Sequence, residues 1–355
     1  MRARRSARLN ALPAGKLPVS LLRRLLAQAA PRGTGCVVVG PGIGLDAAVL
    51  DWGGRYLVAK TDPITFVSEG TGAYALTINA NDLAVMGATP RWFLATILLP
   101  AGKTTGATAA KIFTQLAASC RRLDVRLIGG HTEITTATAR PVIVGCLLGD
   151  CPKGRLVTAA GARIGDAVLL TKGIPIEAVS ILARERAGEL RRRYGVRFAA
   201  RCRRYLDDPG ISVLEDARLA LAAGGVHAMH DPTEGGLSTA LYELAEASKV
   251  GLRIEERAIP VLPEGARLCA DCGLDPLGAI ASGSLLICAA PRSAPAILRC
   301  LTRAGIAAAH IGTIVPAREG VRLVTDGRRP RPLPRFAVDE IARLLDQRGS
   351  APGAR

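Results

Sequence analysis

Apolar residues along the chain follow two spacings that predict strands and helices in turn. Short apolar runs bounded by glycine or proline predict strands, most clearly at residues 92–100 and 140–149. Apolar positions near the 3.6-residue period predict helices at residues 71–87, 106–125 and 237–251. Because strands and helices alternate in both halves of the chain, the pattern predicts an α/β (α+β) fold.

The same patterns predict the remaining elements. Further strands are expected at residues 36–40, a short apolar run that should be buried, and at 167–173, 252–256 and 282–290. A hairpin is expected at 47–62, a strand and glycine turn at 126–134 and a loop at 227–236. Further helices are expected at residues 17–30, 184–204, 211–225, 295–305 and 338–347.

A chain of 355 residues exceeds one typical domain, and its composition changes near residue 152. We therefore predict two domains between two terminal segments. The predicted parts are an arm and helix at 1–32, an N-terminal domain at 33–152, a C-terminal domain at 153–326 and an Arg/Pro-rich, partly disordered tail at 327–355.

Charge and composition narrow the classes of function. The net charge is +17, but the excess is carried by 40 arginines against seven lysines, and aromatic residues make up only 3%. Single-strand binding needs aromatic stacking surfaces, so a nucleic-acid role is not favoured. The longest uncharged stretch, residues 276–291, is shorter than the roughly 20 residues that a spanning helix needs. Nine dispersed cysteines are typical of a reducing cytoplasm.

Four aspartates stand among glycines or turn residues in separate segments. They are Asp46 in GPGIGLDAAVL, Asp62 in VAKTDPI, Asp82 in NDLAVMGATP and Asp231 in HDPTEGG. At the ends of strands and helices, short carboxylates can point into a shared cleft. Mg²⁺ is bound by a few carboxylates together with phosphate oxygens, so the four predict magnesium and phosphate chemistry. Each aspartate taken alone fits a turn or a helix cap equally well.

Histidines and glycines add candidates to this site. His131 in GGHTE is a candidate acid, base or phosphate contact, because histidine is a common proton-transfer residue, and Glu133 would orient it or a water. A histidine in a glycine turn that is hydrogen-bonded to the backbone is an equal alternative. Gly235 and Gly236 open a helix whose N–H groups would face an anion. His227 and His230 are interpreted as loop packing, because a metal pair there would want more nitrogen and sulfur ligands.

Several motifs along the chain resemble those of a known superfamily and occur in the same order as in that superfamily. They are GPGIGLDAAVL, the pair Thr61–Asp62, NDLAVMGATP, GGHTE, TKGIPIE and DPTEGGLSTALYELAEASKVG. This set resembles the aminoimidazole ribonucleotide (AIR) synthetase or PurM-like superfamily, over about Lys16 to Val324. The last motif, with AIPV and CGLDPLGAIASGSLLI, is most similar to the HypE hydrogenase-maturation branch.

The resemblance implies a two-domain PurM-like fold. In it the N-terminal, ATP-binding domain pairs with its twin into a β-barrel-like dimer core, and a C-terminal α/β domain covers a cleft that holds ATP and Mg²⁺. The implied metal ligands are Asp46, Asp62, Asp82 and Asp231. The implied nucleotide-binding residues are Lys60, Thr61, Gly129, Gly130, His131, Thr132, Gly235 and Gly236, with His131 and Glu133 as catalytic candidates.

The sequence departs from the HypE pattern in two places. Leu45 precedes Asp46 where many relatives have paired acids, and the last cysteine is Cys300, whereas HypE proteins end in a cysteine that is carbamoylated and dehydrated to a thiocyanate. We therefore expect Mg²⁺-dependent transfer of the ATP phosphate to an oxygen of an amide, carbamoyl-type or small acceptor, in a cytoplasmic homodimer with a maturation-protein partner. The alternatives are a small-molecule kinase resembling thiamine-monophosphate kinase and a non-catalytic ATP-binding subunit of a maturation complex.

Overall fold

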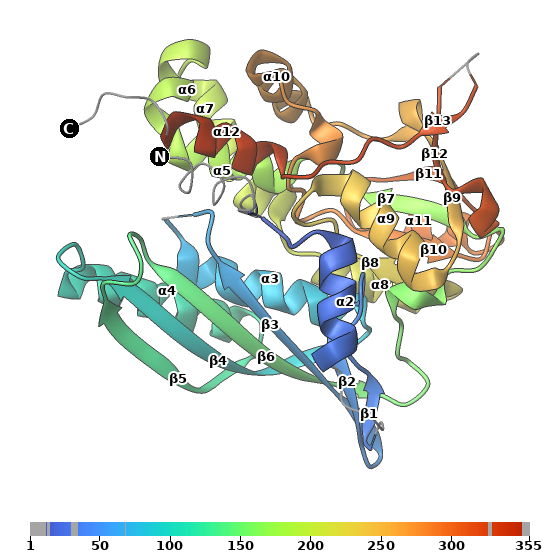
Figure 1. The fold of residues 1–355 in the computed structure, drawn as a ribbon, viewed down its shortest axis with the longest axis horizontal. Helices are drawn as coiled ribbons and strands as arrows, with labels where there is room; N and C mark the ends of the chain where they lie inside the picture. Colours follow the sequence, from blue (N-terminus) through green and yellow to red (C-terminus); the bar gives the residue numbers. More distant parts are fainter. Residues whose placement is uncertain (1–11, 13–14, 30–34, 68, 326–328, 350–355) are drawn as a thin grey trace, which may run out of the picture.

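The chain folds into two α/β domains, each built on a mixed sheet (Figure 1). The structure, a computed structural model, describes residue 12 and residues 15–29, 35–67, 69–325 and 329–349. Within these residues no helix has the length and apolar character needed to cross a membrane. The predicted two-domain α/β architecture is confirmed.

The first sheet has six strands in the order β1-β2-β3-β6-β4-β5. Its strands are β1 Val37–Val39, β2 Ala48–Trp52, β3 Arg55–Ile64, β4 Thr89–Pro100, β5 Arg126–Thr135 and β6 Val142–Pro152. All paired neighbours are antiparallel except β4 and β5. That parallel pair requires a crossover connection, which helix α4 (Gly106–Arg122) provides.

Helix α3 (Thr71–Val85) covers one face of this sheet and is buried along nearly its whole length. Glycines in β6 allow it to lie close: a Cβ atom at Gly145 would stand 2.5 Å from Nδ2 of Asn79 and 2.8 Å from the Phe93 ring. A helix that is apolar on all sides must be enclosed on all sides, so something other than the sheet covers the outer side of α3.

Helix α4 covers part of α3, and the rest of its outer side is covered by the second domain. Its strands are β7 Ala167–Thr171, β8 Val226–His230, β9 Gly251–Glu255, β10 Leu286–Ala289, β11 Ala308–Val315, β12 Val321–Val324 and β13 Arg331–Pro332. Its helices are α5 Ile176–Glu185, α6 Ala187–Tyr194, α7 Val196–Arg204, α8 Leu214–Ala223, α9 Gly236–Ser248, α10 Pro263–Cys272, α11 Ala294–Arg303 and α12 Glu340–Gly349. One hydrophobic cluster runs from the first sheet through α3 into α5 and α8.

The second sheet, ordered β13-β12-β9-β11-β7-β10-β8, is covered on both faces. Val168 and Leu170 of β7 pack in the cluster that contains α9, whereas Leu169 packs in the cluster that contains α8 and α11. Since both faces are covered, β7 and β10 are buried at every position and their sequences are apolar runs without alternation.

Helix α2 (Val19–Ala29) lies beside α9 in Figure 1.

Among the residues that the structure describes, no element covers the other face of the first sheet. Side chains of β6 alternate between buried and half-buried positions, and Val144, Cys146 and Leu148 are among the half-buried ones. The edge strand β5 is exposed at nearly every position. The protein therefore presents an apolar sheet face with an exposed edge, which is unusual for a monomer.

The structure corrects three sequence predictions. Residues 126–135 form one continuous strand instead of a strand and a turn, because a register shift opposite Phe93 and Leu94 accommodates the glycines. Residues 226–230 form β8 instead of a loop, since β10 supplies a pairing partner from far along the sequence. Strand β1 is partly exposed, although its apolar run predicted burial. Of the tail predicted at 327–355, residues 329–349 are described and include β13 and α12, whereas residues 327, 328 and 350–355 lie outside the described residues.

The close approach of α3 to β6 makes a stability prediction. Gly145→Ala should lower the free energy of unfolding by about 2 kcal/mol, because the added methyl group overlaps Asn79 and Phe93. Gly54→Ala is the matched control, since a Cβ atom at that position meets nothing within 4 Å. Urea denaturation of both variants checks this, and equal midpoints would contradict the packing described here.

Candidate functional site

The structure brings the four aspartates together around Lys60. Asp46 lies in the loop before β2, Asp62 in β3, Asp82 in α3 and Asp231 directly after β8. Asp46, Asp82 and Asp231 are buried, whereas Asp62 is partly exposed. Lys60 Nζ lies 3.1 Å from Asp82 Oδ1 and 3.4 Å from Asp62 Oδ2. Burial disfavours the ammonium, but Asp82, Asp62 and Asp46 outweigh it and raise the pKa of Lys60, which stays charged.

A buried histidine ties Asp46 to the second domain. His230 Nδ1 lies 2.6 Å from Asp46 Oδ1, and its Nε2 lies 3.0 Å from Glu243 Oε2 on α9. Burial opposes the imidazolium, but the two carboxylates raise the pKa of His230 well above its usual value. Lys16 Nζ donates to Glu243 Oε1 at 3.0 Å. Although burial acts in the opposite direction, Lys16 and His230 lower the pKa of Glu243 to about 2.

The glycine-rich loop that carries Asp46 rests directly on α9. Gly44 has φ +70°, and a Cβ atom there would stand 2.5 Å from the backbone oxygen of Glu243. Only glycine combines this conformation with so close an approach. The loop and helix therefore hold Asp46 opposite His230.

Several carboxylate oxygens at this site have no hydrogen-bond partner among the described residues. Asp46 Oδ2, Asp82 Oδ2 and both Asp231 oxygens are buried and accept no hydrogen bond from any residue that the structure describes. Ligand atoms of Asp46, His230 and Asp231 lie within 4.8 Å of one another. Burial raises the pKa of Asp82 and of Asp231. Both nitrogens of His230 already face carboxylates, so the atoms left to bind a metal are all oxygens. Oxygen ligands suit a hard cation such as Mg²⁺.

The start of α9 is occupied by the protein itself. The backbone N–H of Gly235, predicted to face an anion, donates to Asp339 Oδ2 at 2.7 Å, and that of Gly236 donates to the Thr233 carbonyl at 3.0 Å. Burial raises the pKa of Asp339 to about 6, although the backbone hydrogen bonds lower it. Asp339 precedes α12, so the C-terminal segment caps α9.

The remaining predicted residues lie elsewhere. Thr61 Oγ1 donates to the carbonyl of Gly145 at 2.8 Å and joins β3 to β6. Gly129, Gly130, His131, Thr132 and Glu133 all lie in β5. His131 Nε2 lies 3.6 Å from Glu133 Oε2, and within the described residues neither side chain forms a hydrogen bond or ion pair with the four aspartates.

Sequence reasoning missed Lys16 and Glu243 and interpreted His230 as loop packing. The composition did contain a signal for Lys16. Lysine is scarce in this arginine-rich chain, yet Lys16 and Lys60 pair with carboxylates of the site, and Lys172 pairs with the buried Asp216 at 3.1 Å. In a chain where arginine is the usual basic residue, the few lysines are therefore candidates for a specific ion pair. Glu243 had no such signal, because one charge on a helix is ordinarily a solvated position.

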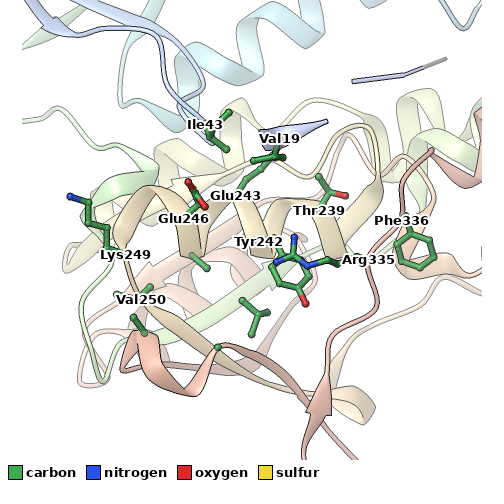
Figure 2. A pocket seen from close by; sticks show the side chains of 14 residues that line it. Val19, Ile43, Thr239, Tyr242, Glu243, Glu246, Lys249, Val250, Arg335 and Phe336 are labelled. Atoms are coloured by element: carbon green, nitrogen blue, oxygen red, sulfur yellow. The ribbon is translucent and has the colours of Figure 1, made fainter. Parts of the chain in front are cut away.

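A cavity of about 520 Å³ lies on the outer side of α9, beside this network (Figure 2). Val19, Ile43 and Phe336 contribute apolar surface, and the Arg335 guanidinium lies 3.5 Å from the centre of the Tyr242 ring. Glu243 lines the cavity as well as contacting His230. The cavity therefore adjoins the carboxylate cluster through a shared residue.

Comparisons with known proteins identify the family of this chain. Models of the N-terminal and C-terminal domains of AIR synthase related protein match residues 44–151 and 163–324. Carbamoyl dehydratase HypE of Rhizobium leguminosarum bv. viciae is 31% identical over 280 residues, covering 74% of each chain.

Solved structures share the fold. A chain of the HypE–HypF complex superposes with a TM-score of 0.74 at 22% identity and covers 89% of this chain and 100% of its own. HypE in complex with ATP superposes with a TM-score of 0.69 at 24% identity and covers 93% of this chain and 98% of its own. The resemblance seen in the sequence is confirmed: the chain belongs to the PurM-like, AIR synthase-related superfamily, among the HypE hydrogenase maturation proteins.

Proposed function

We propose that this protein binds ATP with Mg²⁺ at Asp46, Asp62, Asp82 and Asp231 and transfers the terminal phosphate to an oxygen of an amide or carbamoyl group. The observation that carries the proposal is the set of buried carboxylate oxygens around one lysine that have no partner in the described part of the chain. The name carbamoyl dehydratase among the relatives and the crystallisation of a HypE with ATP support it.

Each residue of the cluster then has a defined task. The unpartnered oxygens of Asp46, Asp82 and Asp231 would hold the cation, which neutralises phosphate charge when it is bound. Lys60, charged because its neighbours are carboxylates, would donate to a phosphate oxygen. The imidazolium of His230 would keep Asp46 in place. Such transfers depend chiefly on positioning and charge neutralisation.

The cavity beside α9 is our candidate for the nucleoside. Its apolar and aromatic surface suits a planar base, and Glu243 connects it with the carboxylates that would take the phosphates. Phosphates and base would thus lie on either side of the loop that carries Ile43 and Asp46.

We also propose that the uncovered face of the first sheet packs against a second copy of the chain. Apolar, half-buried side chains on β6 and the exposed strand β5 support this. Thr96 and Leu98 are half-buried on this face, and His131 and Glu133 are their partners in register. His131 and Glu133 would therefore enter a dimer interface, and a role in catalysis would require the second copy. A HypF-like protein is the proposed further partner, by analogy with the HypE–HypF complex.

The decisive assay follows ADP formation by purified protein with Mg·ATP and a short peptide that contains S-carbamoylcysteine. We expect ADP formation that depends on both Mg²⁺ and the peptide. Turnover with thiamine monophosphate instead would favour the kinase alternative. Tight Mg·ATP binding without turnover on any acceptor would favour a non-catalytic subunit.

Removing one charge from the cluster should weaken nucleotide binding. Asp82→Asn and Asp231→Asn should each raise the Kd for Mg·ATP at least about tenfold, because each removes an anionic oxygen from the cation site. Asp51→Asn is the control, since Asp51 is exposed, pairs with Lys153 and lies outside the cluster. Isothermal titration calorimetry measures all three, and unchanged affinity in both site variants would refute the cation site.

Cation binding should strengthen as pH rises. Burial raises the pKa of Asp82 and Asp231, so both carry protons at a pH where ordinary aspartates are ionised, and the cation must displace them. The affinity for Mg·ATP should therefore be higher at about pH 8 than at about pH 6, with protons released on binding. Calorimetry in two buffers of different ionisation enthalpy counts the protons, and no net release would contradict the assignment.

The dimer makes a separate prediction. Val144→Lys should shift the protein from dimer to monomer, because it places a charge at the centre of the uncovered face. Ile164→Lys is the control, since Ile164 is 65% exposed in a loop outside the first sheet. Sedimentation velocity distinguishes the states. A dimer that persists in the Val144→Lys variant would exclude this face as the interface.

A further inference from the structure

Glu177 is a buried carboxyl group that the cation site does not use. It lies in the first turn of α5 and is 6% exposed. Strands β7 and β8 end at the same edge of the second sheet, because Leu170 and His230 both pair with Leu286. The segment that leads to Glu177 follows β7, and Asp231 follows β8. The segment that carries Glu177 therefore begins at the same end of the sheet as Asp231, which belongs to the candidate cation site.

Helix α5 also faces the first domain. Tyr74 of α3 and Ser180 of α5 have their hydroxyl oxygens 2.9 Å apart, one helical turn from Glu177. Arg184 donates to Ser180 Oγ at 2.6 Å and thus bonds to the neighbouring hydroxyl. Glu177 consequently lies where the second domain meets the helix that carries Asp82.

The Glu177 carboxyl is only half satisfied. Ser282 hydrogen-bonds to it, but its Oε2 atom is buried and has no partner among the described residues. Glu340 offers a contrast in the same domain, because it is also buried but accepts from Asp275 N and from Arg343. A buried acceptor without a donor costs stability, so the free oxygen of Glu177 is not explained by folding.

Its surroundings favour a proton on this group near neutral pH. Burial, followed by the charges of Asp339, Glu234 and Asp231, raises the pKa of Glu177 to about 7, although Ser282 lowers it. Tyr74 faces the same region, and Glu177 contributes to the raised pKa of its hydroxyl. A group that titrates near the working pH exchanges protons efficiently.

We propose that Glu177 binds the phosphate acceptor, with its free oxygen accepting a hydrogen bond from the N–H of an amide, and removes that proton during transfer. This inference rests on the proposed function. The amide oxygen forms a bond to the γ-phosphorus as the bond to the bridging β,γ-oxygen breaks, and ADP leaves. The N–H electron pair becomes the C=N bond, and the proton passes to Glu177 and then to water. The product is an O-phosphorylated imidate.

The test is Glu177→Gln, with Glu340→Gln as the control that changes a fully bonded buried carboxyl in the same way. Glu177→Gln should bind Mg·ATP within about twofold of wild type and lose about 100-fold in ADP formation with the S-carbamoylcysteine peptide. Its residual rate should lack the acidic limb near pH 7 that wild type shows. Glu340→Gln should keep both rate and limb. A Glu177→Gln rate and pH profile equal to wild type would overturn the inference.

A second readout needs no turnover. A raised folded-state pKa means that Glu177 reduces stability as pH rises from its unfolded pKa towards 7. The melting temperature of Glu177→Gln should therefore be higher than that of wild type at about pH 8 and close to that of wild type at about pH 5. If the difference in melting temperature between variant and wild type were the same at both pH values, this would refute a free titrating carboxyl at this position, independently of the ATP assays. Wild-type protein that binds no Mg·ATP would refute the proposed function, while the melting curves still test Glu177.

Discussion

The enclosure of α3 between the first sheet and the second domain is the constraint on which the rest of the structure depends. An apolar helix buried on every side can carry polar residues only if each has a partner. Asn79 accepts from the backbone N–H of Asp62, and Asn81 bonds to the backbone of Ile211 and Val213. These bonds orient β3 and the second domain about one rigid helix. Asp82 on that helix consequently meets groups from both domains.

The carboxylate cluster is the exception to this satisfied interior. Several buried carboxylate oxygens lie around one lysine, so among the described residues this cluster has more carboxylates than cations to pair with them. Groups of this kind are retained at the expense of stability where function requires them. The network of Lys16, Glu243 and His230 limits the cost at Asp46 by balancing two carboxylates with two cations.

The sequence predicted the parts of this structure that depend on local pattern. The hairpin about Gly53, the helices α3, α4 and α9 and the family follow from periodicity and ordered motifs. What could not be predicted depends on distant pairing. β8 is a strand because β10 lies beside it, and Glu243 meets His230 because a helix face happens to turn towards a strand end. The position of Glu177 depends in the same way on two strands that share an edge, which no local window contains.

The contact between Asp339 and Gly235 joins two segments that lie 104 residues apart in the sequence. A ligand phosphate that sought the same N–H group would have to compete with the protein's own carboxylate, so the two anions exclude each other there. The segment before α12 thus acts as an internal mimic of a ligand. While Asp339 accepts this hydrogen bond, the N–H of Gly235 at the first turn of α9 is not available to a ligand.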